Sequence, residues 1–158
     1  MKINAIVKLL LCILLPVGVG GLSAYLSGTA DSAWFDTLQK PSFNPPAYLF
    51  APVWTVLYIL MGIGLFIILQ APKSSERTNA LWIFAIQLFF NFWWSLLFFR
   101  FHLLVVSVVE IAILWILIVV MISAFKKIKP IAGYLQIPYL MWVSFATVLN
   151  AAITYLNS

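Results

Sequence analysis

The segment from Trp34 to Tyr58 carries the residues whose types are hardest to explain as simple membrane filler. It begins as a polar loop, passes three prolines and runs directly into an apolar stretch that contains Pro52 and Trp54. Proline removes a helix hydrogen bond and bends the axis, and buried Trp and Tyr side chains need partners for their polar atoms. A helix that only crosses a bilayer needs none of these features. The segment therefore indicates the edge and wall of a cavity.

Three helix faces place large aromatic residues beside small or amide residues. Side chains three, four, seven and eight positions apart share one face of a helix. The residues on these faces are Ala51, Pro52, Trp54 and Tyr58; Asn91, Trp94, Ser95 and Phe98; and Trp142, Phe145, Ala146, Leu149 and Asn150. Aromatic walls with a few polar groups suit a flat apolar ligand. The same pattern also serves packing between membrane helices, so the spacing leaves both interpretations open.

Glu110 is the one carboxylate inside an apolar run. An acid in the hydrocarbon region is costly and is by default a functional candidate, although it can equally be a protonated or hydrogen-bonded structural acid. No neighbouring base gives it a catalytic partner. Cys12 and His102 are the only residues of their types, so we expect neither a disulfide nor a protein metal site. We expect no required cofactor.

The composition is that of a membrane protein. Hydrophobic residues make up 65% of the chain and charged residues 8%, against about 25% charged in an ordinary soluble domain. At 158 residues we expect a single domain, 1–158. The net charge of +5 comes from cations dispersed between apolar runs without a basic stripe, which argues against nucleic-acid binding. The lipid bilayer is the expected surrounding.

Five apolar runs are long enough to cross about 30 Å of hydrocarbon as helices. They cover residues 3–26, 46–70, 79–101, 103–125 and 131–156. The runs show no apolar/polar alternation, so helices are favoured over barrel strands. We therefore predict an all-α bundle of five transmembrane helices. The long first loop, 27–45, is expected to hold a short interfacial helix near 34–39.

The cations predict an orientation. Five crossings put the termini on opposite sides, with two cations, Lys40 and Arg100, on the C-terminal side. The N-terminal side would carry Lys2, Lys8, Lys73, Arg77, Lys126, Lys127 and Lys129. The positive-inside rule then predicts a cytoplasmic N-terminus, with the first loop outside, in a bacterial cell membrane.

Small residues recur in the first run at Gly20, Ala24 and Gly28. This four-residue spacing permits close approach of another helix. The series can serve packing inside the bundle or the face of a dimer, and we expect a homodimer.

The chain resembles the TspO/MBR family, the bacterial relatives of the mitochondrial translocator protein. The matching residues fall in three blocks that keep their order and spacing over most of the chain. They are Trp34, Leu38 to Ser42, Pro45, Pro46, Ala51, Pro52, Trp54, Leu57, Tyr58, Met61 and Gly62; Gln87, Asn91, Trp94, Phe98 and Phe99; and Pro138 to Asn150.

The resemblance implies five helices around a ligand pocket that is capped by the long first loop. Carried over position by position, the matched lining residues are Ala24, Ala51, Trp54, Asn91, Trp94, Trp142, Ala146 and Leu149. Phe50 and Val53, like Ser27, Val106 and Ile113, fall at lining positions but differ in type from the mitochondrial pattern. Tyr58, Phe98 and Phe145 from the helix faces complete the predicted site.

The resemblance also implies the ligands. They are tetrapyrroles (porphyrin or haem) and drug-like or sterol-like apolar molecules, bound by a receptor-like protein that regulates tetrapyrrole metabolism or a stress response. The mitochondrial C-terminal sterol pattern is broken here, because Val148 and Tyr155 are followed by no cation. Lys129, Tyr134 and Leu140 fit only the reversed pattern.

Two other functions stay open. One is light-dependent breakdown of bound porphyrin, with Trp54, Trp94 and Trp142 as the reactive candidates, although no hydrolytic or redox-cofactor motif is present. The other is transport of porphyrins or sterols, which five helices disfavour because they cannot form an even inverted repeat.

Overall fold

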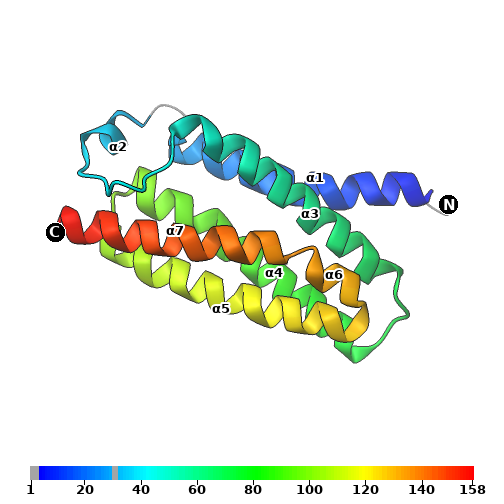
Figure 1. Cartoon of the computed structure of the whole chain (residues 1–158). Helices are drawn as coiled ribbons and strands as arrows, with labels where there is room; N and C mark the ends of the chain where they lie inside the picture. The colour runs from blue at the N-terminus through cyan, green and yellow to red at the C-terminus, as the bar shows by residue number, and fades with distance from the viewer. Residues whose placement is uncertain (1–3, 30–31) are drawn as a thin grey trace.

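The computed structural model describes residues 4–29 and 32–158, and the regular elements within these ranges are all helices (Figure 1). The elements are α1 Ala5–Ser27, α2 Ala33–Thr37, the 3-10 turn Ala47–Leu49, α3 Phe50–Gln70, α4 Ser75–Ser95, the π turn Leu96–Arg100, α5 Leu104–Ile128, α6 Pro130–Tyr134 and α7 Ile137–Leu156. Five of the described segments are long and apolar enough to cross a membrane, the last being α6 and α7 together. This confirms the predicted all-α fold with five spans.

The helices form an asymmetric bundle. Helix α1 packs against α3 and α4, α4 packs against α5, and α5 packs against α6 and α7. The short helix α6 also lies against α3, whereas the backbones of α3 and α7 lie farther apart and the two helices meet through aromatic side chains. The largest fully buried side chains include Tyr139, Phe125, Met61, Ile68 and Met121. Figure 1 shows α1 beginning at one end of the bundle and α7 ending at the other.

Two glycines show how closely α1 and α3 approach. A Cβ at Gly62 would overlap backbone atoms of Cys12 and Ile13 in α1. In the other direction, a Cβ at Gly20 would overlap the ring of Tyr58 in α3. Gly20 therefore serves packing inside the bundle.

The other members of the predicted small-residue series have different surroundings. Ala24 is exposed, and Gly28 ends α1 in a left-handed conformation with φ +68°. Glycine adopts this conformation without steric cost. The Gly28 N–H donates to the Ala24 carbonyl at 3.1 Å. The homodimer stays a prediction.

Two helix ends differ from the sequence prediction. Helix α4 begins at Ser75 rather than near 79, because the Ser74 Oγ accepts from the Arg77 backbone N–H at 3.1 Å and caps the polar first turn. Helix α5 runs on to Ile128, three residues past the predicted end at 125. Its last turn carries Lys126 and Lys127, which a helix C-terminus favours.

The fifth span is interrupted, which the apolar run 131–156 did not reveal. Helix α6 ends at Tyr134 and α7 starts at Ile137, with Leu135 and Gln136 between them. Pro138 lies in the first turn of α7. A proline has no N–H and its ring clashes with the carbonyl four residues earlier, so the helix cannot pass Tyr134 unbroken.

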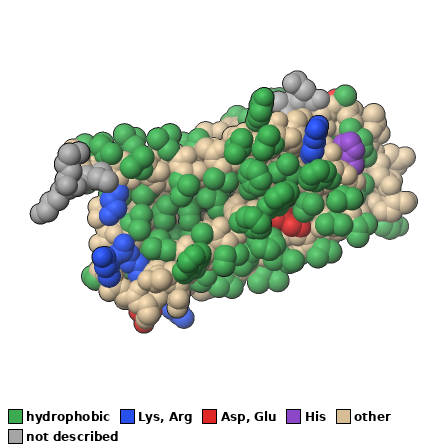
Figure 2. All heavy atoms as spheres, turned by 180° about the vertical axis from the view of Figure 1, so that it is seen from behind, with side chains coloured by type: hydrophobic (Ala, Val, Ile, Leu, Met, Phe, Trp, Pro, Cys, Tyr) green, Lys and Arg blue, Asp and Glu red, His purple; other side chains and the backbone are tan. Residues whose placement is uncertain are grey.

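The charged side chains gather mainly at one end (Figure 2). Lys8 lies near the start of α1, Lys73 lies between α3 and α4, and Lys126 and Lys127 end α5. Lys40 and Arg100 lie at the opposite end of the bundle. Lys40 is in the loop before α3, and Arg100 ends the π turn after α4. Lys2 and the start of the first predicted run lie outside the described residues.

We expect Gly62→Ala to lower the stability of the bundle. The added methyl group meets the α1 backbone, which cannot yield without moving the helix, and overpacking of this kind costs about 1–3 kcal/mol. Thermal unfolding in detergent, followed by circular dichroism, measures the change.

The matched control is Gly18→Ala, because a Cβ added there meets no atom within 4 Å. It should unfold at or above the wild-type temperature, since Ala is the better helix former. Equal unfolding temperatures for the two variants would contradict close packing of α1 on α3 at Gly62.

Candidate ligand-binding site

An aromatic cluster lies where α3, α4 and α7 meet. The ring of Trp54 stacks on Tyr58 with centroids 5.5 Å apart and planes 26° apart. Trp94 of α4 lies 6.3 Å from Trp54, and Tyr139 of α7 meets it edge-on at 6.2 Å. Such aromatic pairs contribute beyond their buried area, so the cluster joins three helices firmly.

A chain of buried hydrogen bonds runs behind this cluster. The Tyr58 hydroxyl donates to Asn91 Oδ1 at 2.7 Å, and Asn91 Nδ2 donates to the Tyr139 hydroxyl at 3.0 Å. The Tyr139 hydroxyl then donates to Gln87 Oε1 at 2.9 Å. Gln87 and Tyr139 are each fully buried. The chain satisfies polar atoms that would otherwise be costly in an apolar interior.

Gln87 and Tyr139 were not among the predicted site residues. Gln87 precedes Asn91 by four positions, so it shares the helix face already singled out. Tyr139 stands three positions before Trp142 on the predicted face of the last run. In both cases helical spacing alone could have identified the residue as part of the site.

A small inner cavity lies beside the cluster. Its volume is about 30 Å³, which is room for about one water molecule. It is lined by Phe35, Phe50, Trp94, Phe98, Phe99, Ala146, Leu149, Asn150 and Ile153. Phe35 comes from α2, so the first loop contributes to the wall of this cavity.

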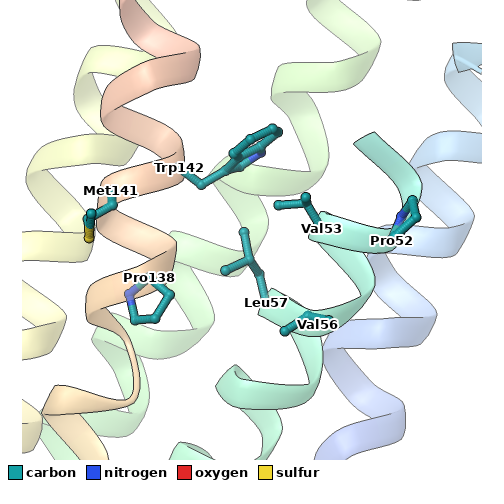
Figure 3. Close-up of a pocket in the computed structure, with 7 residues that line it drawn as sticks. All are labelled: Pro52, Val53, Val56, Leu57, Pro138, Met141 and Trp142. Atoms are coloured by element: carbon teal, nitrogen blue, oxygen red, sulfur yellow. The ribbon is translucent and has the colours of Figure 1, made fainter. Parts of the chain in front are cut away.

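A larger outer groove opens between α3 and α7 (Figure 3). Its volume is about 530 Å³, within the range of small-molecule sites. It is lined by Pro52, Val53, Val56, Leu57, Pro138, Met141 and Trp142. Figure 3 shows Val53 and Leu57 of α3 pointing towards Trp142 of α7 across the gap.

The structure divides the predicted ligand-binding residues between these features. Those that line the inner cavity are Phe50, Trp94, Phe98, Ala146 and Leu149. Val53 and Trp142 line the outer groove, and Trp54, Tyr58 and Asn91 belong to the cluster and its hydrogen-bond chain.

Phe145 lines neither hollow and packs between Trp142 and the first loop. It lies 5.6 Å from Trp142 and 6.3 Å from Phe43, measured between ring centroids. The ring of Phe50 meets Trp142 at 5.8 Å. Phe50 and Trp142 therefore form part of the wall between the inner cavity and the outer groove.

Several residues predicted to line the pocket lie elsewhere. Ala24, Ala51, Val106 and Ile113 are exposed and line neither hollow. Ser27 is buried, and its hydroxyl donates to the Ala24 carbonyl at 3.2 Å. In this conformation the cavity wall is formed by α3, α4, the π turn, α7 and the first loop, without α1 or α5.

Some buried polar atoms have no hydrogen-bond partner among the described residues. They include Trp94 Nε1, Trp142 Nε1, Gln87 Nε2 and both carboxyl oxygens of Glu110. Buried donors without acceptors are costly, so each is a place where a bound molecule could supply the missing partner. The two indole N–H groups belong to residues that line the inner cavity and the outer groove.

The first loop is fastened to the end of the bundle. The predicted short helix is present as α2, Ala33–Thr37. Trp34 stacks on His102 with ring centroids 3.9 Å apart and planes 16° apart. The Gln39 N–H donates to Asn157 Oδ1 at 3.0 Å, and Asn157 Nδ2 donates to the Gln39 carbonyl at 2.9 Å. The C-terminal residues thus hold the loop beside the inner cavity.

Comparison with known proteins confirms the family resemblance that the sequence predicted. Residues 12–156 match the sequence profile of the TspO/MBR family. The chain is 42% identical to the tryptophan-rich protein TspO of Chlorobaculum tepidum over 96% of this chain and 97% of that protein. It is 35% identical to the tryptophan-rich sensory protein of Cereibacter sphaeroides over 78% and 77% of the two chains. It is 33% identical to the translocator protein of Bos taurus over 87% and 82%.

We expect Tyr139→Phe to destabilise the bundle. Removing the hydroxyl leaves Asn91 Nδ2 and Gln87 Oε1 without partners in a buried place, which costs about 1–3 kcal/mol for each unsatisfied group. The unfolding temperature in detergent should fall. Tyr155→Phe is the control, since Tyr155 is 84% exposed. An unchanged unfolding temperature for Tyr139→Phe would show that this chain of hydrogen bonds contributes little to the stability of the bundle.

Proposed function

Because the chain belongs to the TspO/MBR family, we propose that this multi-pass membrane protein is a receptor for tetrapyrroles such as porphyrin or haem. The names of its relatives describe a sensory protein and a translocator protein, and neither name states a ligand. The proposal extends to other flat apolar molecules of drug-like or sterol-like chemistry. Binding would regulate tetrapyrrole metabolism or a stress response.

The observation that carries the proposal is the set of unpaired indole N–H groups beside the aromatic cluster. Trp94 and Trp142 each hold a buried Nε1 without a partner among the described residues. A porphyrin offers an extended aromatic face for the rings and peripheral carboxylates that accept hydrogen bonds. Such a ligand would satisfy both requirements of the site.

The proposed site must widen to admit such a ligand. The inner cavity of about 30 Å³ is far smaller than the few hundred Å³ of typical ligand pockets. Phe35 of α2 lines the cavity, and the loop is held by the two hydrogen bonds between Gln39 and Asn157. We propose that the first loop moves away on binding, so that the cavity expands towards Trp54 and Trp142.

We expect Ala146→Phe to weaken porphyrin binding at least about tenfold, which corresponds to about 1.4 kcal/mol. Ala146 is buried on the wall of the inner cavity, and a phenyl ring there would occupy the space the ligand needs. Quenching of tryptophan fluorescence during a porphyrin titration measures the affinity.

Ala151→Phe on the same helix is the matched control, since Ala151 is exposed. It should bind as the wild type does. Wild-type affinity in a folded Ala146→Phe protein, verified by its circular dichroism melt, would place the ligand away from the inner cavity.

The same preparation distinguishes the alternative functions. Light-dependent breakdown would convert bound porphyrin into products detectable by mass spectrometry, with Trp54, Trp94 and Trp142 as the candidate reactive residues. Transport would give net flux of porphyrin into sealed liposomes. The receptor proposal expects saturable binding with neither products nor flux.

We also propose that the protein lies in a bacterial cell membrane with its N-terminus in the cytoplasm. Lys8, Lys73, Lys126 and Lys127 lie at the end of the bundle where α1 begins. Clusters of Lys and Arg favour the cytoplasmic side.

This orientation can be tested with single cysteines in a Cys12→Ser background. Ser42 in the first loop and Ser75 at the start of α4 are both exposed and lie at opposite ends of the spans. We expect Ser42→Cys, but not Ser75→Cys, to react with an impermeant maleimide in intact cells. Both should react after lysis. Labelling of Ser75→Cys alone in intact cells would reverse the orientation.

A further inference from the structure

The outer groove lies where the backbone of the fifth span moves away from α3 beyond the close contact at α6. Gln136 Nε2 donates to the Leu60 carbonyl of α3 at 3.2 Å and to the Ala132 carbonyl at 3.3 Å. Gly64 permits this approach, because a Cβ there would overlap the Gln136 amide. The span breaks at this contact, and the backbone of the new helix, which starts at Ile137, lies farther from α3.

The lining of the groove is suited only to hydrocarbon. It consists of two prolines, four aliphatic or thioether side chains and one indole: Pro52, Pro138, Val53, Val56, Leu57, Met141 and Trp142. Proline has no N–H to offer, and the lining includes no charged, hydroxyl or amide side chain. The Trp142 indole N–H is the one side-chain donor of the lining and is itself buried, so the exposed walls offer no partner to water or to a polar ligand.

The groove is continuous with the lipid-facing surface at the depth of the hydrocarbon. Its walls lie inside both spans, in the first half of Ala47–Gln70 and around the middle of Pro130–Leu156. Val56 is 56% exposed and Met141 is 68% exposed, so the groove opens outwards where lipid chains surround the bundle. An unfilled hollow of about 530 Å³ would forfeit the dispersion contacts of its lining atoms.

We propose that this groove is a binding site for one acyl chain of a membrane phospholipid, next to the proposed tetrapyrrole site, with which it shares the Trp142 side chain. A flexible chain can bend into a short hollow bounded by residues 52–57 of α3 and 138–142 of α7. At about 1.5 Å per residue these stretches are only about 8 Å long, too short to seat a helix of a second copy over several turns. The one donor on the lining, Trp142 Nε1, is buried, so the carboxylates of a porphyrin would find no exposed partner on the groove walls.

The site has a consequence for the inner cavity. Val53, Leu57 and Trp142 line the groove, and Trp142 contacts Phe50, which lines the inner cavity, at a centroid distance of 5.8 Å. An acyl chain in the groove therefore supports the outer side of the wall between the two hollows. Lipid occupancy and the width of the inner cavity are coupled through these side chains.

The test uses the full chain reconstituted in phosphatidylcholine that carries a photoactivatable diazirine on its acyl chain. After illumination, mass spectrometry of the peptides locates the attached lipid. We expect labelling at Met141 well above that at Val105 of α5, because the two residues are equally exposed, at 68% and 66%, and only Met141 lines the groove. Equal labelling at the two positions would overturn the proposal.

A variant that fills the groove gives the second arm. Val56→Trp should abolish the excess labelling at Met141, whereas Val109→Trp should leave it unchanged, since Val56 and Val109 are 56% and 57% exposed. If Val56→Trp does not fold, the smaller change Val56→Leu should reduce the excess in part. Persistence of the excess in a folded Val56→Trp or Val56→Leu protein would overturn the site.

One further readout would identify another occupant, and a second is independent of the lipid site. Disulfide-linked dimers of Val56→Cys in a Cys12→Ser background, formed in the bilayer, would assign the groove to a second copy and overturn the lipid proposal. Porphyrin titration of Val56→Trp is independent: the labelling result stands whether or not the protein binds porphyrin.

Discussion

The hydrogen-bond chain from Tyr58 through Asn91 and Tyr139 to Gln87 is the interaction on which the arrangement of the bundle depends. In a bilayer the lipid tails are as apolar as the helices, so burial of apolar surface does little to bring helices together. Close packing and interhelical hydrogen bonds must do so. The chain joins α3, α4 and α7 through bonds of 2.7 to 3.0 Å. The Ser23 hydroxyl, which donates to the Phe92 carbonyl at 2.6 Å, adds α1 to the same group of helices.

The break in the fifth span explains why one side of this bundle stays open. Gln136 and Gly64 hold the span against α3 at one level, and the start of α7 after the break directs the following residues towards α5. Tyr139 still reaches Asn91 from this helix, so α7 is joined to α4, and it meets α3 through aromatic side chains such as Trp54 and Tyr139. One interrupted helix therefore produces both the closed aromatic cluster and the outer groove.

The sequence predicted the five spans because long apolar runs leave few alternatives in a membrane. It missed the start of α4, since Ser75 to Asn79 are polar and only the cap at Ser74 marks the helix there. Helical spacing singled out Trp54 on one face and Asn91 with Trp94 on another, and the structure places all three in one cluster with its hydrogen-bond chain. Spacing could not separate an inner cavity from an outer groove, because that division depends on the distance between α3 and α7. For the same reason it could not show that Ala24 and Ala51 are exposed.

The hydrogen-bond partners of the indole N–H groups distinguish tryptophans that only pack from those that could bind a ligand. Trp115 faces outwards at 38% exposure, yet its Nε1 donates to the Ser144 hydroxyl at 2.8 Å. The fold thus supplies an acceptor even for an indole at the lipid-facing surface, where a bare N–H is costly. Trp94 and Trp142 are more buried and have no such acceptor among the described residues. If these two served packing alone, a nearby hydroxyl like Ser144 would be the simplest way to satisfy them. The unpaired donors of Trp94, beside the inner cavity, and Trp142, beside the outer groove, therefore favour a ligand that brings its own acceptors.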